Sequence, residues 1–237
     1  MSTTPLRIPY AAPSGERGEV SALASEAAPG TASVGALALA HGAGADMHHR
    51  FMAALAESLA THGVATLRYQ FPYTEAKRRR IDAQPLLLTC VRAAAAACAT
   101  HWPELACFAG GKSMGGRMTT LAASMSPLPV VGLVAFGFPL HPRGQPATHR
   151  ADHLAHLPHP LLVLQGTRDE LGEVARLAPC LPASAQLHVV EHADHGFDVL
   201  RRSGRDAAEV MAELARTVAD FMLAHASTPA EPREPLV

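Results

Sequence analysis

Apolar runs of strand length alternate with helical patterns along almost the whole chain, and this alternation constrains the fold more than any other feature. The runs "GALALA" and "PLLVLQG" have the length and continuity that are typical of buried strands. Between such runs, Phe51, Leu55 and Leu59 recur at helical spacing before Gly63, a residue type that commonly ends helices. The alternation predicts an α/β fold in which helices cover both faces of a mostly parallel sheet.

The same patterns place the individual elements. We expect strands at 35–40, 64–70, 104–109, 130–136, 160–166 and 185–191, and helices at 49–63, 85–100, 170–178 and 206–226. A further helix follows a glycine-rich turn, and its inner stripe is expected to be Met114, Met118, Leu121 and Met125. Residues 6–11 and 18–25 flank the turn sequence "PSGERG", which predicts an antiparallel hairpin at the edge of the sheet.

Chain length and loop length predict a single domain. A chain of 237 residues, 48% of them hydrophobic, can bury one substantial core, whereas two full domains would be cramped. The stretch 137–160 is expected to be a loop with one short helix, which leaves no separate lid domain. We therefore expect one domain over 1–226 and a flexible, proline-rich tail over 227–237.

Charge and targeting signals narrow the choice of partners. The formal net charge is −1, so no strong field favours nucleic acid or an anionic membrane, and a small molecule is the more natural partner. The chain begins without a basic segment followed by an apolar stretch, and no apolar run approaches spanning length. These features favour a cytoplasmic protein.

Cysteines and histidines give no sign of a metal centre. The four cysteines lack metal-type pairing and are expected to be reduced packing residues: Cys90, Cys98, Cys107 and Cys180. Two histidine groups are alternative ligand sets, His153, His156 and His159, or His188, His192 and His195. Pro158 interrupts the first set, and the second includes a residue with a different expected role, so we expect neither a metal nor another cofactor.

A glycine-rich turn carries the strongest functional signal. Residues 111–115, "GKSMG", match G-x-S-x-G between an expected strand and an expected helix, the context of a nucleophile elbow. A phosphate loop is excluded because Ala106 stands where glycine is needed. A dinucleotide fingerprint that begins at Gly42 fails because Met47 replaces its third glycine. The turn therefore predicts that Ser113 is a nucleophile.

A serine nucleophile needs a base, and the base needs an acid that orients it. In the chain order serine, acid, histidine, Asp169 follows the expected strand 160–166 and His195 follows the expected strand 185–191. We predict that Asp169 is the orienting acid and His195 the general base. The alternatives are an N-cap role for Asp169, and Asp194, Asp198 or His192 in place of the chosen acid and base.

Two backbone N–H groups must also stabilise an oxyanion. We expect one from Met114, directly after the serine, and one from Ala43 in the loop "HGAGAD". Gly42 and Gly44 leave that loop without side-chain bulk and are candidate substrate-binding residues.

Aromatic and basic residues near the expected site have two interpretations each. Phe71 and Tyr73 follow a strand end and are candidates for a substrate-pocket wall, although core packing explains them almost equally well. Lys112 is expected to be a partly buried stem with local contacts rather than an attractor of anionic substrates. The run "KRRR" at 77–80 is expected to be a solvated loop rather than a docking patch.

Several of these segments together resemble a known family: "HGAGADMHHRFM", "LRYQFPY", "GGKSMGGRM", "GFPLHPRGQPATHRADHL", "LVLQGTRDELG" and "ADHGF". They are similar to a predicted alpha/beta-hydrolase family related to the hydrolase-like domain of an animal chromatin-acetylating complex subunit, and more broadly to dienelactone-hydrolase-like enzymes. The resemblance runs from about Ala36 to Phe197, and it implies the alpha/beta-hydrolase fold and the triad of Ser113, Asp169 and His195. Dienelactone hydrolases use a cysteine nucleophile where this chain has serine, so their substrate is not carried over.

The sequence thus predicts a serine hydrolase that works without a cofactor. Its expected partner is a small-molecule acyl substrate, a small or medium ester, cleaved through an acyl-enzyme intermediate. The alternatives are a thioesterase or a peptidase of the same fold, or a non-catalytic interaction module that retains the fold. The sequence leaves the oligomeric state open.

Overall fold

The computed structural model describes residues 3–226, and these build one eight-stranded sheet in the order β1-β2-β4-β3-β5-β6-β7-β8. The strands are β1 Thr3–Ala11, β2 Arg17–Ser25, β3 Gly35–Ala40, β4 Val64–Tyr69, β5 Cys107–Lys112, β6 Gly132–Phe136, β7 Leu161–Gly166 and β8 Gln186–Val190. All pairs from β4 to β8 are parallel, whereas β1 and β2 pair antiparallel at one edge. The mostly parallel sheet and the edge hairpin are confirmed, and the expected tail 227–237 lies outside the described residues.

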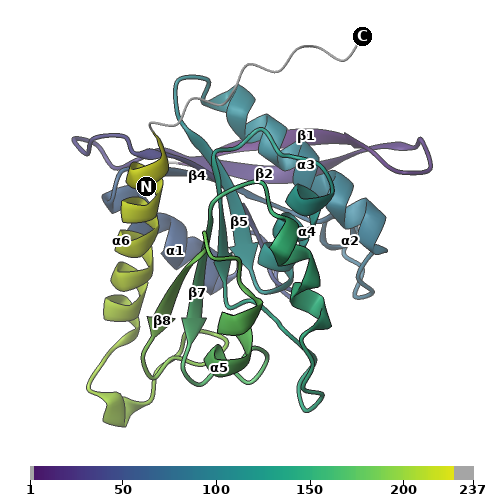
Figure 1. The fold of residues 1–237 in the computed structure, drawn as a ribbon. Helices are drawn as coiled ribbons and strands as arrows, with labels where there is room; N and C mark the ends of the chain where they lie inside the picture. Colours follow the sequence, from purple (N-terminus) through teal and green to yellow (C-terminus); the bar gives the residue numbers. More distant parts are fainter. Residues whose placement is uncertain (1–2, 227–237) are drawn as a thin grey trace.

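Helices cover both faces of this sheet. The longer helices are α1 Arg50–Thr61, α3 Gln84–His101, α4 Met114–Met125 and α6 Ala207–Ala226, and the short ones are α2 Pro72–Glu75 and α5 Val174–Leu177. Three 3₁₀ segments lie at η1 His149–His156, η2 Ala178–Cys180 and η3 Arg201–Ser203. One hydrophobic cluster joins α1 and α6 to the sheet, and a second joins α3, α4 and η1 to the opposite face (Figure 1).

The strand sequences explain why both faces are covered. In β3, Leu37 and Leu39 pack towards α1 and α6, while Ala36, Ala38 and Ala40 pack towards α3 and α4. This period of two places an apolar side chain on each face in turn, so neither face can be left in water. The small alanine side chains also let helices approach that second face closely.

The strand order reverses direction between β3 and β5. The neighbouring strands β3 and β5 lead into α1 and α4, which lie on opposite faces. The loop after β3 and the turn after β5 therefore diverge, and in parallel sheets ligands bind at such a point. Between β6 and β7, the described chain holds only η1 and no inserted domain, as expected.

Three local expectations need correction. Met125 is 67% exposed at the end of α4, so the buried stripe of that helix stops before it. The strand expected at 104–109 runs from Cys107 to Lys112, because Gly110 and Gly111 continue the ladder with β6 and β3. The helix expected at 170–178 begins only at Val174, since Asp169 and the residues after it form a tight turn.

The burial of the cysteines and the lengths of the helices are as follows. Cys90, Cys98 and Cys107 are buried and Cys180 is half-buried, all four as free thiols, as the sequence predicts. Among residues 3–226, none of the helices combines the length and the apolar character that crossing a bilayer requires.

Two leucines of α6 test the packing against the sheet. Leu214 is completely buried whereas Leu223 is 56% exposed on the same helix. We expect Leu214→Ala to lower the free energy of unfolding by about 2–5 kcal/mol, because it leaves a cavity, and Leu223→Ala to change it by less than about 0.5 kcal/mol. Urea unfolding followed by circular dichroism measures both variants, and equal losses would contradict the assigned face of α6.

Candidate active site

Ser113 occupies the turn between β5 and α4 in a strained backbone conformation. Its φ of 52° and ψ of −116° lie in a region that side-chain-bearing residues rarely adopt. The Ser113 N–H donates to the carbonyl of Phe136 at 2.9 Å, which ties the turn to the end of β6. The strain lifts the hydroxyl away from the sheet, and the side chain is half-buried rather than sealed.

Glycines around the serine allow this conformation. A Cβ atom at Gly111 would lie 2.6 Å from the carbonyl oxygen of Ala40, and one at Gly115 would lie 2.5 Å from the same atom. A Cβ at Gly116 would lie 2.6 Å from the Gly111 carbonyl oxygen. Since these contacts are with backbone, larger residues would force β3, β5 and α4 apart.

The three side chains of the predicted triad form one hydrogen-bonded chain. The Ser113 hydroxyl lies 2.8 Å from His195 Nε2, and His195 Nδ1 lies 2.7 Å from Asp169 Oδ2. Because the carboxylate accepts at Nδ1, that nitrogen carries the proton and Nε2 is free to accept the serine proton. The structure thus brings together three residues that are separated by 82 and 26 positions.

Gln165 holds the acid, and no motif in the sequence indicated it. Gln165, at the end of β7, donates from Nε2 to Asp169 Oδ2 at 2.8 Å and to the Gly172 carbonyl at 2.7 Å, while its Oε1 accepts from the Phe138 N–H. These partners fix the orientation of the Gln165 amide. The other carboxylate oxygen, Asp169 Oδ1, accepts the Leu171 N–H at 2.8 Å. A polar glutamine inside the apolar run "LLVLQG" was the available signal.

The alternative acids and base lie elsewhere. Asp194 Oδ1 accepts the N–H groups of Gly196 and Asp198, and so shapes the loop that carries the histidine. Asp198 forms an exposed ion pair with Arg50, and His192 is exposed. Asp169 is not the N-cap of α5, a position taken by Glu173. Only Asp169 among these carboxylates contacts the imidazole of His195 within the described chain.

Backbone donors border the serine on its other side. Within residues 3–226, the N–H groups of Ala43 and Met114 donate to no protein acceptor, and Met114 opens α4, where the first N–H groups lack helical partners. A Cβ at Gly42 would lie 3.5 Å from Ser113 Cβ, so the loop after β3 packs directly against the serine. The half-charge of the helix N-terminus favours an anion at the same point.

His41 holds that loop in place. Its Nδ1 donates to the Gly42 carbonyl at 2.8 Å, and its Nε2 accepts the Phe71 N–H at 3.1 Å. An imidazole that donates at one nitrogen and accepts at the other is neutral, and burial of the ring lowers the pKa of His41. His41 is a second residue whose positioning role the sequence analysis missed.

The two predicted aromatic wall residues have different positions. Phe71 is 0% exposed and packs edge-on against His41 and Tyr69, so it supports the loop after β3 and offers no surface to a substrate. This placement corrects the expectation for Phe71. Tyr73 is buried too, yet it borders a cavity of about 690 Å³ together with Gly44. A second cavity of about 490 Å³ is lined by His195, Leu171 and Arg143.

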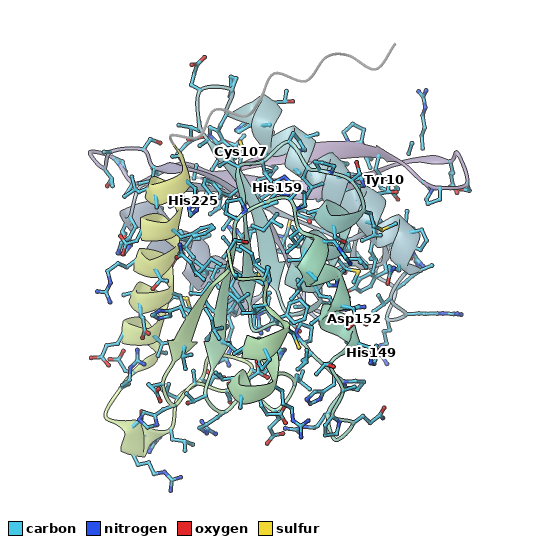
Figure 2. All side chains as sticks on the ribbon, in the orientation of Figure 1. Tyr10, Cys107, His149, Asp152, His159 and His225 are labelled. Atoms are coloured by element: carbon cyan, nitrogen blue, oxygen red, sulfur yellow. The ribbon has the colours of Figure 1, made fainter. Side chains whose placement is uncertain are left out.

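The histidines proposed as alternative metal ligands are dispersed. His153 Nε2 contacts the Thr120 hydroxyl at 2.8 Å, and His188 Nε2 contacts Glu213 at 2.7 Å. Figure 2 shows His159 towards the same end of the sheet as Cys107, whereas His149 lies towards the opposite end. In the described part of the chain, no three His, Cys, Asp or Glu side chains are grouped as a metal site would need.

Two glycines of the site differ in the space that an added Cβ atom would find, and their alanine variants are expected to differ in stability. We expect Gly115→Ala to lower the melting temperature strongly, because its Cβ would lie 2.5 Å from a backbone oxygen. Gly42→Ala meets its nearest neighbour at 3.4 Å, so we expect a nearly unchanged melting temperature in that variant. Thermal unfolding by circular dichroism compares the two, and a stable Gly115→Ala protein would contradict the close approach of α4 to β3.

Comparison with solved structures identifies similar folds. A Xanthomonas campestris α/β serine hydrolase described as lacking a lid is 19% identical, with a TM-score of 0.71 and coverage of 97% of this chain and 99% of that one. An Anabaena variabilis dienelactone hydrolase is also 19% identical, with a TM-score of 0.68 and coverage of 95% and 100%. The esterase domain of a Rhodothermus marinus protein is 15% identical, with a TM-score of 0.67 and coverage of 94% and 100%.

At these identities the similar structures establish the fold alone. The sequence itself adds a family assignment, since residues 33–223 match the alpha/beta hydrolase domain family. That match includes β3, the turn at Ser113 and the loops that carry Asp169 and His195. The chain therefore belongs to the alpha/beta hydrolase domain family, and its fold is the alpha/beta-hydrolase fold.

Proposed function

We propose that this protein is a serine hydrolase that cleaves small or medium acyl esters through an acyl-enzyme intermediate. The observation that carries the proposal is the continuous hydrogen-bonded chain from the Ser113 hydroxyl through His195 to the buried Asp169. A serine hydroxyl is a weak nucleophile near neutral pH, and this arrangement is the one that activates it. Membership of the hydrolase family supports the same reaction class.

The first half-reaction follows from the positions of these atoms. Ser113 Oγ attacks the acyl carbonyl carbon as its proton passes to His195 Nε2, and the carbonyl oxygen takes up the negative charge. Asp169 accepts the Nδ1 hydrogen bond and stabilises the imidazolium that forms. The N–H groups of Ala43 and Met114 donate to the oxyanion.

Collapse of the tetrahedral intermediate breaks the bond to the leaving group. The proton on His195 Nε2 passes to the leaving oxygen, and the acyl group remains as an ester on Ser113. Water then enters, gives its proton to His195 and attacks the same carbon, and the second collapse returns that proton to Ser113 Oγ and releases the acid. No cofactor takes part in these steps.

The space around His195 supports the proposed substrate size. The imidazole is 26% exposed and lines the cavity of about 490 Å³, so a leaving group next to Nε2 can be accommodated there. The stretch from β6 to β7 contributes no cap domain over the described site, which favours compact esters over long lipids. A thioesterase or a peptidase of the same fold would use the same atoms, and comparison of p-nitrophenyl acetate, acyl-CoA and dipeptide substrates ranks the three.

A serine-directed probe tests the proposal without knowledge of the substrate. We expect a fluorophosphonate to label the wild-type protein, and Ser113→Ala to abolish labelling and to lower ester hydrolysis at least about a thousand-fold. Intact-mass measurement counts the adducts, and we expect one per chain. The absence of labelling in the folded wild-type protein would contradict the proposal and favour an interaction module, the role that the resemblance to the chromatin-complex subunit suggests.

Replacement of the acid tests the role of Asp169 separately from the nucleophile. Asp169→Asn keeps the shape but cannot hold the imidazole in the same tautomer, so we expect kcat to fall by about a thousand-fold or more. Asp198→Asn removes only an exposed ion pair with Arg50 and serves as the control, with kcat within about twofold of wild type. Steady-state kinetics on p-nitrophenyl acetate would contradict the assignment if the two variants behaved alike.

A further inference from the structure

Lys112 brings a buried cation to the centre of the proposed site. It is the last residue of β5, and it follows Phe108 by four positions, so its side chain leaves the sheet on the face of α1 and α6. The residue is only 9% exposed. Its ammonium lies 5.8 Å from the ring centre of Phe51 and 5.5 Å from that of Phe197, two rings that stack on each other.

The ammonium also borders the pair formed by Asp169 and His195. A Cβ atom at Gly137 would lie 3.0 Å from Lys112 Nζ, 3.4 Å from Asp169 Oδ2 and 3.4 Å from His195 Nδ1. The three polar atoms therefore surround one point, which is vacant because residue 137 is glycine, with a φ of 63°. No side chain from β6 separates the lysine charge from the hydrogen bond that orients the base.

The charges that face Lys112 come from the two loops that also hold the acid and the base. Asp169 after β7 and Asp194 after β8 attract the ammonium, His195 faces it, and α1 offers only the ring of Phe51. Lys112 takes part in none of the ion pairs within 4 Å among residues 3–226, so the cation is buried without a direct ion pair. Burial lowers the pKa of Lys112 to about 8, although both aspartates act in the opposite direction.

Packing alone does not require a cation here. A methionine has a similar length, fits a site between two phenylalanine rings and avoids the desolvation of an ammonium. The positive charge is thus the property that distinguishes lysine from an apolar residue at this position, and the acid and the base are among the polar groups around it.

We propose that Lys112 is a positioning residue whose ammonium holds Asp169 and His195 as carboxylate and neutral imidazole, the state from which Ser113 is activated. The inference rests on the proposed function of this site. A positive charge opposes the addition of a proton to the neighbouring imidazole, so His195 stays available as a base at lower pH than it would without the lysine. The same charge destabilises the His195 imidazolium that forms during turnover. This destabilisation is lost when Lys112 loses its proton.

The direction in which the pH profile of labelling moves distinguishes a charge effect of Lys112 from a purely structural role. In Lys112→Met, we expect the acid limb of the fluorophosphonate labelling rate to move to higher pH by about one unit. We expect Lys112→Arg to stay near the wild-type position. Lys77→Met, which removes the charge of an exposed lysine, should leave the profile unchanged. A variant that only loosens the site would instead lower the rate equally at every pH.

Proton NMR gives a readout that does not depend on hydrolysis. The His195 Nδ1 proton, bonded to Asp169 at 2.7 Å, is expected to resonate far downfield, and its shift follows the protonation of the ring as pH changes. We expect its titration midpoint to lie about one unit higher in Lys112→Met than in wild type. If that variant does not fold, Lys112→Gln, which also removes the charge, gives the same comparison with wild type.

The outcomes separate this inference from the proposed function. Equal midpoints in wild type and in the variant without the lysine charge would overturn the role of Lys112, while labelling of Ser113 left the hydrolase proposal intact. Failure of the wild-type protein to react with the fluorophosphonate would instead remove the hydrolase proposal, and the NMR titration would still decide whether Lys112 acts on His195.

Discussion

The strained turn at Ser113 is the constraint on which the rest of the site depends. It exists because β3, β5 and α4 approach so closely that only glycine fits at 111, 115 and 116. The same approach brings the loop after β3 against the serine and leaves the N–H groups of Ala43 and Met114 beside it. A relaxed turn would cost the protein less free energy, but it would bury the hydroxyl in the sheet or turn it away from His195.

The parallel sheet brings the other residues of the site to Ser113. Carboxyl ends of parallel strands share one edge, so residues after β3, β5, β7 and β8 meet although they are far apart in sequence. Neighbouring side chains hold these loops: Gln165 donates a hydrogen bond to Asp169, and His41 donates one to the Gly42 carbonyl in the loop after β3. Lys112, the last residue of β5, places a positive charge next to the acid and the base, and Ser113 directly follows it in the chain.

The sequence sufficed for the features that rest on local pattern. The period of apolar residues predicted the strands, the covered faces and the edge hairpin, and the spacing of Gly111, Ser113 and Gly115 predicted the elbow. The order of strand ends was enough to place Asp169 and His195 in loops that meet. The predicted positions agree with the structure because strand, turn and loop geometry are encoded within a few residues of each position, while the catalytic roles stay predictions.

Tertiary contacts explain what the sequence did not reveal. Phe71 follows a strand end in a position that suits a pocket wall, yet it packs beneath His41 because the loop after β3 folds over it. Gln165 lies outside any motif, and Lys112 occupies a variable position of the G-x-S-x-G turn, so the motif says nothing of its contacts with Asp169, Asp194 and Phe197. Met125 continues the helical period past the point at which α4 leaves the core.

A crystal structure of the protein with a phosphonate bound at its proposed nucleophile tests the central claim most directly. The account predicts a bond from phosphorus to Ser113 Oγ, a phosphoryl oxygen within hydrogen-bonding distance of the Ala43 and Met114 N–H groups, and His195 Nε2 facing the leaving-group position. A phosphonate attached to another residue, or one whose phosphoryl oxygen points into solvent away from both N–H groups, would contradict it.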